Sequence, residues 1–184
     1  MNKRSPHEVR IIGGQWKRSK LPVADRPGLR PTPDRVRETL FNWLGHDLSG
    51  WRCVDAFAGS GALGFEAASR GAAEVVLLES DRELARSLEA MCTRLGASTV
   101  SVRCTDAIGW LGRANADSLD LLFIDPPFDS DRLAPALRAG ARLLRASGLI
   151  YVESRSALAE LPEGWALHRQ ARAGAVHSHL LHRQ

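Results

Sequence analysis

One run of four residues carries side chains that could act together on an amino group: Asp125-Pro126-Pro127-Phe128. Tandem prolines fix the backbone and offer no N–H, so the Pro126 carbonyl and the Asp125 carboxylate are two rigid acceptors near each other. Two acceptors match the two N–H donors of an exocyclic amine on a nucleobase. Phe128 offers a flat apolar face on which that base could stack. We therefore predict Asp125, Pro126 and Phe128 as catalytic residues.

The chemistry that such a pair favours is methylation of the amine. The lone pair of an exocyclic amine is delocalised into the ring, and accepting both N–H bonds localises it, so that the nitrogen can attack a sulfonium methyl in line. The product ammonium is acidic, so Asp125 or water can take its proton. The alternative is a plain turn after a buried strand, with Asp125 as a cap and Phe128 in the core. The D-P-P motif alone does not exclude it.

A glycine loop, residues 59–64 (GSGALG), matches the G-x-G-x-x-G pattern between a strand and a helix. Such a loop can bind the pyrophosphate of a dinucleotide or the methionine end of S-adenosylmethionine. Asp55, just before the loop, favours the second ligand, because its carboxylate would repel a pyrophosphate and attract an ammonium. The alternative is a nicotinamide-dependent oxidoreductase. No catalytic Tyr and Lys pair is obvious for such an enzyme here, because the only tyrosine is Tyr151.

Acidic residues also follow the next two strands. Glu79 can accept both ribose hydroxyls of the cofactor, Asp106 can accept from the adenine amino group, and the Ala107 N–H can serve a ring nitrogen. The alternatives are a helix-capping or surface acid for Glu79 and a plain N-cap for Asp106. The cofactor-binding residues predicted from these strand ends are Asp55, Ala58, Gly59, Gly61, Glu79, Ser80, Asp106 and Ala107.

Strands and helices that alternate after residue 50 position these groups. The pattern predicts strands at 52–57, 74–78, 99–104, 119–124 and 149–152, and helices at 63–70, 81–95, 107–111 and 133–144. Short strands linked by helices predict a parallel sheet covered on both faces, whose ligands bind at the carboxyl ends of the strands. Two further strands, 166–172 and 176–182, meet at Gly174 as a hairpin, so one of them must run antiparallel.

The N-terminal part is strongly basic. Residues 1–40 hold ten Lys or Arg against four acids, a net +6, whereas the remaining 15 basic and 17 acidic residues give −2. A hairpin is expected over 9–22, and its basic residues predict a nucleic-acid contact, with a solvated basic tail as the alternative. The predicted contacts are Arg10, Lys17, Arg18 and Lys20. A helix should open at Pro33 with Thr32 as its cap, and bury Val36, Leu40, Trp43 and Leu44.

Length and composition fit a single globular domain with a short appendage. The chain has 184 residues, of which 44% are hydrophobic and 25% charged. We expect a basic segment at 1–49 packed on a main domain at 50–184. No run is long enough to span a membrane and no secretory signal is visible, so a cytoplasmic protein is expected. The three cysteines suggest neither disulfides nor a metal site.

The motifs resemble a known family. Residues 55–64 (DAFAGSGALG) together with DPPF resemble class I methyltransferases that act on base amino groups. Residues 10–16 (RIIGGQW), 29–32 (LRPT), 34–44 (DRVRETLFNWL) and 151–153 (YVE) are similar to the bacterial 16S ribosomal RNA (guanine-N2)-methyltransferase family. The resemblance covers nearly the whole chain.

The resemblance implies an α/β Rossmann-like class I methyltransferase fold, with helices on both faces of a seven-stranded, mostly parallel sheet that has one antiparallel strand. It also implies S-adenosyl-L-methionine as methyl donor and a guanine N2 of ribosomal RNA, in small-subunit particles, as acceptor; a monomer is expected. Arg30 and Thr32 would line the cofactor site, and the basic hairpin would bind RNA. His177 and His179 depart from the family pattern, and an edge-strand or RNA-contact role is expected for them rather than metal binding.

Two other functions stay open at this point. The same amine-binding motif could serve an adenine N6 methyltransferase, because it does not name the base. A non-catalytic RNA-binding or assembly protein would also carry a basic hairpin on an α/β domain.

Overall fold

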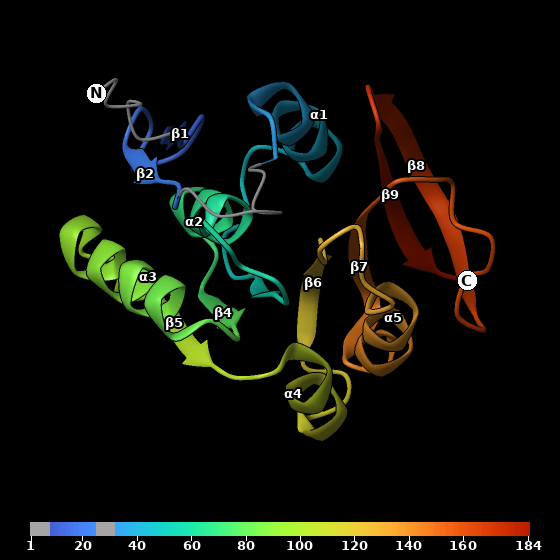
Figure 1. Cartoon of the computed structure of the whole chain (residues 1–184). Helices are drawn as coiled ribbons and strands as arrows, with labels where there is room; N and C mark the ends of the chain where they lie inside the picture. Colours follow the sequence, from blue (N-terminus) through green and yellow to red (C-terminus); the bar gives the residue numbers. More distant parts are fainter. Residues whose placement is uncertain (1–7, 25–31) are drawn as a thin grey trace.

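A seven-stranded sheet forms the centre of the protein in this computed structural model, which describes residues 8–24 and 32–184 (Figure 1). Strands β3, β4, β5, β6 and β7 are parallel, whereas β9 runs antiparallel to both of its neighbours, β7 and β8. The order across the sheet is β5-β4-β3-β6-β7-β9-β8. The predicted seven-stranded, mostly parallel sheet with one antiparallel strand is therefore confirmed. The strands are β3 (Arg52–Asp55), β4 (Glu74–Glu79), β5 (Val100–Cys104), β6 (Leu119–Ile124), β7 (Leu144–Ser154), β8 (Trp165–Ala173) and β9 (Val176–Arg183).

Helices cover both faces of the sheet, because alternate side chains along the buried strands are apolar on both sides. One core lies between the sheet and helices α1, α2 and α3, and contains Phe41, Phe65 and Leu88. The other core lies between the sheet and helices α4 and α5, and contains Leu111 and Leu137. The helices are α1 (Asp34–Leu44), α2 (Ala62–Ser69), α3 (Arg82–Leu95), α4 (Ala107–Arg113) and α5 (Leu133–Ala141).

The glycine loop joins β3 to α2 at the carboxyl edge of the sheet. Gly61 has a φ of 76°, a conformation that disfavours other residues. Gly64 lets the helix approach the sheet, since a Cβ atom there would lie 2.2 Å from Cδ2 of Leu77. The loop is therefore shaped for close packing of helix on strand as well as for a ligand.

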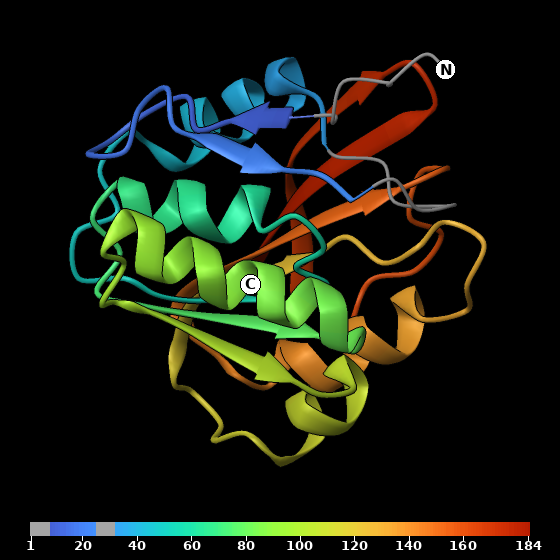
Figure 2. The same cartoon turned by 60° about the vertical axis from the view of Figure 1, so that its left-hand side comes forward.

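The N-terminal hairpin packs on α2. Strands β1 (Glu8–Arg10) and β2 (Lys20–Pro22) pair antiparallel, which confirms the predicted hairpin, although its strands are shorter than the span 9–22 suggested. Backbone N–H groups of the connecting loop bond to α2: Gln15 to the Ser69 carbonyl at 2.8 Å, and Trp16 to the Ser69 hydroxyl at 2.9 Å. Figure 2 shows the hairpin lying above α2 and α3. Among the described residues, no helix is long and apolar enough to cross a membrane.

Two sequence expectations about where elements end were wrong. The helix predicted to end at 144 ends at Ala141, and Leu144 instead begins β7, where it pairs with Leu119 before a register shift. The helical spacing of alanines and leucines masked this strand, whose pairing comes from a segment distant in sequence. The strand predicted to end at 57 ends at Asp55.

Helix α1 also differs from its prediction. Its N-cap is Pro33, with no side-chain cap, because the Thr32 hydroxyl bonds elsewhere. Trp43 and Leu44 are only partly buried, and the fully buried residues of α1 include Arg37 and Phe41. The apolar spacing identified the correct side of the helix at Val36 and Leu40, but it could not reveal a buried arginine.

Buried Glu66 explains why the Arg37 side chain is buried. The Glu66 carboxylate accepts from the Ile12 backbone N–H at 2.8 Å, from the Arg37 guanidinium at 3.4 Å and from the Arg70 guanidinium at 2.9 Å. The Arg37 and Glu66 side chains are both fully buried. One carboxylate on α2 thus holds the hairpin, α1 and the end of its own helix.

We expect the Glu66→Gln variant to lose about 3 kcal/mol of unfolding free energy, because it removes the only buried carboxylate that pairs with the Arg37 and Arg70 guanidinium groups among the described residues and leaves Arg37 with the exposed Asp34 alone. Urea denaturation followed by circular dichroism measures this. The control is Glu74→Gln, which breaks the exposed pair between Glu74 and Arg52 and should cost about 1 kcal/mol at most. Equal losses in the two variants would contradict the role given to Glu66.

Candidate active site

Three carboxyl groups lie on neighbouring strands at the carboxyl edge of the sheet. Asp55 ends β3, Asp125 follows β6, and Glu153 lies near the end of β7. Asp55 and Glu153 are buried, and Asp125 is half-buried. Burial raises the pKa of Asp55 to about 7 and that of Glu153 to about 6, and, with repulsion from Glu153 and Asp55, it raises the pKa of Asp125 well above its usual value. This edge favours a positively charged ligand.

Asp55 leaves one acceptor unused. Its Oδ2 accepts from the Gly64 backbone N–H at 3.2 Å. Its Oδ1 is buried, and in the described part of the chain it has no hydrogen-bond partner. Such a group is costly unless a ligand satisfies it. An ammonium group beside the glycine loop would do so, which fits the methionine end of S-adenosylmethionine.

Glu79 lies against the glycine loop. Its two carboxylate oxygens accept from the backbone N–H groups of Gly59 at 3.0 Å and Asp81 at 2.8 Å. The cap of α3 is Asp81, which accepts from the N–H groups of Glu83 and Leu84. Glu79 is thus neither a helix cap nor a free surface acid, and each of its oxygens keeps lone-pair capacity for a hydroxyl. Ser80 is exposed beside it, and Ala58 is buried before Gly59.

Asp106 caps α4. Its Oδ2 accepts from the Gly109 N–H at 2.8 Å, and its Oδ1 pairs with Arg132. The Gly109 N–H and then Arg132 lower the pKa of Asp106. The plain N-cap that the sequence offered as the alternative is therefore present, and a contact with adenine stays a prediction. Ala107, whose N–H was the second predicted adenine contact, is the buried first residue of α4.

The turn at Asp125-Pro126-Pro127-Phe128 leaves most of the hydrogen-bonding capacity of Asp125 unused among the described residues. Asp125 accepts from the Thr32 hydroxyl at 3.3 Å, and the structure gives it no backbone N–H partner among the described residues. The turn after β6 is instead closed by the Pro127 carbonyl, which accepts from the N–H and hydroxyl of Ser130. Phe128 is half-buried outside both cores, with the Arg155 guanidinium 5.8 Å from its ring centre. These contacts disfavour a capping Asp125 and a core Phe128.

The comparisons with known proteins bear on the whole chain. The family model described as "Conserved hypothetical protein 95" matches residues 9–182. The Ribosomal RNA small subunit methyltransferase D of Escherichia coli K12 is 44% identical over 185 residues, which cover 96% of this chain and 91% of that protein. The Haemophilus influenzae protein of the same name is 41% identical over 175 residues, covering 92% and 91%. This chain belongs to that family.

Solved structures support the family's fold. The Escherichia coli protein yhhF is similar with a TM-score of 0.85 and 43% identity, over 97% of this chain and 99% of that one. Since the structural relatives include methyltransferases, the predicted Rossmann-like class I methyltransferase fold is confirmed. The resemblance drawn from the glycine loop, DPPF and the N-terminal motifs is confirmed with it.

Sequence reasoning missed two groups near Asp125: one repels its charge, and the other holds the residue that donates a hydrogen bond to it. Glu153 accepts from the Tyr151 hydroxyl at 2.9 Å, and the same hydroxyl lies 3.2 Å from the Ser178 hydroxyl on β9. Arg37 donates to the Thr32 carbonyl at 3.4 Å, and so holds the residue that bonds Asp125. The sequence could have indicated Glu153, because it is an acid inside an apolar strand. It could not have indicated Arg37, because this arginine lies among the charged residues of a basic segment.

The basic residues predicted to contact RNA are exposed on the hairpin. Arg10, Lys17, Arg18 and Lys20 all reach solvent, and Lys20 also pairs with Glu8 at 2.7 Å. Arg30, predicted to line the cofactor site, lies outside the described residues. The structure leaves the roles of all five as predictions.

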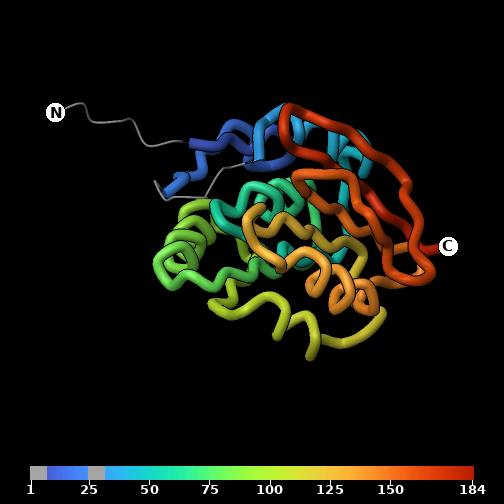
Figure 3. Tube along the Cα trace, turned by 45° about the vertical axis from the view of Figure 1, so that its right-hand side comes forward, coloured from blue at the N-terminus to red at the C-terminus, as the bar shows by residue number. Residues whose placement is uncertain are grey.

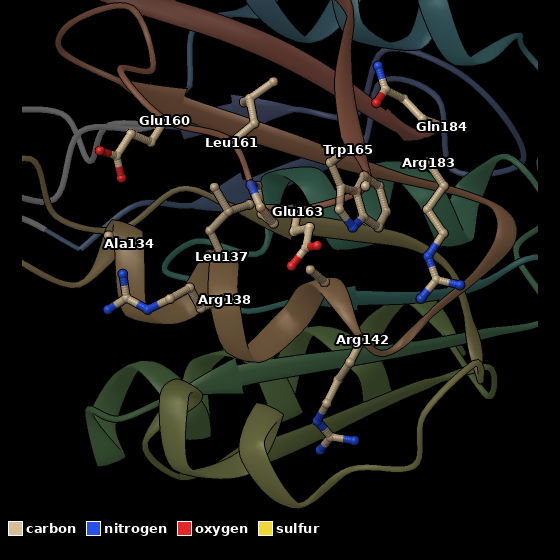
Figure 4. Close-up of a pocket in the computed structure, with 13 residues that line it drawn as sticks. Ala134, Leu137, Arg138, Arg142, Glu160, Leu161, Glu163, Trp165, Arg183 and Gln184 are labelled. Carbon is tan, nitrogen blue, oxygen red and sulfur yellow. The ribbon is translucent and has the colours of Figure 1, made fainter.

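A groove of about 700 Å³ lies elsewhere, between α5, the segment before β8 and the end of β9. Figure 4 shows Trp165, Glu163 and Arg183 around it. No residue predicted for the active site lines this groove. Arg142, at its margin, donates to the carbonyls of Leu111, Gly112 and Ala114, and so closes the end of α4.

We expect Asp55→Asn to become more stable relative to the wild type as pH rises from about 4 to about 7. The folded pKa of Asp55 is about 7 against 3.8 for the free group, so the folded state binds more protons in this window and loses stability as pH rises. The difference should reach about 4 kcal/mol at most. Urea denaturation of both proteins across this range measures it; a constant difference would contradict the buried, unpaired carboxyl.

Proposed function

We propose that the protein transfers a methyl group from S-adenosyl-L-methionine to the exocyclic N2 amine of a guanine in 16S ribosomal RNA of the small subunit. One observation carries the proposal: the rigid acceptors of Asp125 and Pro126 follow β6, directly beside β3, which ends in Asp55 and the glycine loop. Amine site and cofactor site are thus neighbours at one sheet edge. The relatives named as small-subunit ribosomal RNA methyltransferases support the substrate class.

The cofactor, when bound, supplies an electrophilic methyl group on a sulfonium, with a neutral thioether as leaving group. Asp55 would bind its ammonium through the unused Oδ1. The backbone of Gly59 and Gly61 would lie against the methionine end of the cofactor, while their own N–H groups donate to Glu79 and to the Ala58 carbonyl. Glu79, beside Ser80, binds the ribose hydroxyls, while Asp106 and Ala107 meet the adenine. Thr32, whose hydroxyl bonds Asp125, would also line the cofactor site; the same role is proposed for Arg30 from the family resemblance alone.

The amine is held by two acceptors. The Asp125 carboxylate and the Pro126 carbonyl accept its two N–H bonds and localise the nitrogen lone pair, while Phe128 stacks on the base. In the free protein, burial keeps the pKa of Asp125 high. A positive charge bound beside Asp125 lowers that pKa and favours the ionised acceptor. Asp125 or water then takes the proton released by the product ammonium.

The test is methyl transfer from labelled cofactor to small ribosomal subunits reconstituted on transcribed, unmodified 16S ribosomal RNA. We expect N2-methylguanine as the labelled nucleoside. N6-methyladenine would overturn the guanine assignment and keep the amine chemistry, whereas no transfer to either base would overturn the proposal.

We expect Asp125→Ala to lower turnover about 100- to 1,000-fold, because it removes one of two acceptors that act on the reacting amine. Cofactor affinity, measured by calorimetry, should change less than about threefold. Asp129→Ala is the control, since Asp129 is an exposed acid in the same loop. Turnover that is equal in the two variants would exclude Asp125 from the reaction and favour a non-catalytic RNA-binding protein.

We expect the double variant Lys17→Glu, Arg18→Glu to weaken RNA binding and to flatten its dependence on salt, because contacts with phosphates release counterions. Filter binding to the same reconstituted subunits at several salt concentrations measures both effects. The double variant Arg82→Glu, Arg86→Glu, at two exposed arginines of α3, is the matched charge reversal. A double variant that binds like this control would assign the hairpin charges to solvation alone.

A further inference from the structure

The hairpin of β8 and β9 ends at the same sheet edge as the active site. β8 runs in the direction of β7, because both pair antiparallel with β9, so the turn around Gly174 lies at the carboxyl ends of the parallel strands. On β9, His177 pairs with Ser154 of β7, one residue after Glu153. Neighbouring strands lie about 4.8 Å apart. The hairpin tip is therefore about two strand spacings from the end of β6, where Asp125 begins its loop.

One arginine, one glutamine and two histidines share one face of this tip. Directly opposed residues of antiparallel strands point to the same side of a sheet, which places Arg172 beside His177 and Gln170 beside His179. Leu181, two residues beyond His179, belongs to the core of α4 and α5, so all four side chains face that side. We call Arg155, Gln170, Arg172 and His177 the flanking surface; all four are at least partly exposed, and His179 is buried beneath them.

The flanking surface continues to Phe128. Arg155 follows the last residue of β7 and places its guanidinium 5.8 Å from the Phe128 ring centre. His177 stacks on His179 with ring centres 6.3 Å apart and planes 11° apart. His179 is 2% exposed, and its buried Nδ1 has no hydrogen-bond partner within the described residues. A buried imidazole thus lies against a partly exposed one close to the hairpin tip.

The charges of this hairpin all have one sign. Residues 164–184 hold three arginines and four histidines and no acid, in a chain whose net charge is only +4. Asp129, which follows Phe128, pairs with Arg155 at 2.9 Å, and both side chains are mostly exposed. Exposed ion pairs are weak, so a phosphate can take the arginine. The Arg172 Nε–H donates to the Gly174 carbonyl, which leaves the terminal N–H groups of the guanidinium for a ligand.

We propose that the flanking surface binds the RNA backbone phosphates next to the nucleotide held at Asp125 and Phe128. The proposal rests on the proposed function. A nucleotide turned into a pocket leaves its neighbouring phosphates at the rim, and here the rim on the β7 side is basic. The N-terminal hairpin and α1 lie on the other face of the sheet, so RNA held at both contacts would cross the carboxyl edge of the sheet; Figures 1 and 3 show the two hairpins on opposite sides of α1. A metal site does not explain the histidines, because no third ligand joins them among the described residues.

The competing explanation is that arginine and histidine only protect an exposed edge strand from pairing with other chains. The test variant carries both Arg172→Gln and His177→Gln. It is compared with Arg172→Lys, which keeps the charge, and with Arg86→Gln, which is a distant control. The probe is the small subunit reconstituted on transcribed 16S ribosomal RNA. Binding is measured at several salt concentrations, and turnover at saturating subunits.

The double variant should bind subunits about five- to tenfold more weakly, with a salt slope lower by about one. Its cofactor affinity and its turnover at saturating subunits should stay within about twofold of the wild type, and Arg172→Lys should retain most of the binding. Subunit affinity equal to that of Arg86→Gln, with or without aggregation, would overturn the proposal. A wild-type protein that binds subunits through this surface but transfers no methyl group would overturn the proposed function and leave this inference standing.

Discussion

The structure depends on three carboxyl groups held side by side, largely out of water, at the ends of β3, β6 and β7. Burying a carboxylate is unfavourable, and burying three together is more so, which is why the pKa values of Asp55, Asp125 and Glu153 are all raised. Tyr151 and Thr32 satisfy part of their hydrogen-bonding capacity, but Oδ1 of Asp55 is left without a partner among the described residues. The proposed cofactor carries a sulfonium and an ammonium against one carboxylate. Its net positive charge would compensate the negative charge of these carboxylates.

A second buried charge network fixes the N-terminal segment over that edge. Glu66 holds the hairpin through Ile12 and holds α1 through Arg37, and Arg37 in turn holds the carbonyl of Thr32, whose hydroxyl bonds Asp125. The basic hairpin and Asp125 are thus joined by a short chain of contacts through the protein interior. Under the proposed function, this chain would fix the position of Asp125 relative to RNA bound by the hairpin.

Sequence alone predicted the elements whose signals are local. The alternation of strands and helices, the glycine loop and the DPPF turn gave the sheet and the edge at which the site lies. Leu144 was assigned to a helix because its strand pairing with Leu119 depends on a distant segment. Arg37 and Glu153 were missed as site residues for a related reason: their partners, Glu66 and Tyr151 with Ser178, become visible only when α1, α2, β7 and β9 are packed together. Asp106 illustrates a different difficulty. Its position in the sequence fits both a helix N-cap and a cofactor-binding residue, and the structure has it as the N-cap.

The most direct test of this account is the number of protons released when S-adenosylmethionine binds. Calorimetry near pH 7, in buffers of different ionisation enthalpy, gives that number for the wild type and for Asp55→Asn. The account predicts proton release by the wild type, because a bound cation lowers the pKa of a carboxyl that is about 7 in the free protein, and a smaller release by the variant. Tight binding with no proton release from the wild type, or binding of a nicotinamide dinucleotide in place of S-adenosylmethionine, would contradict it.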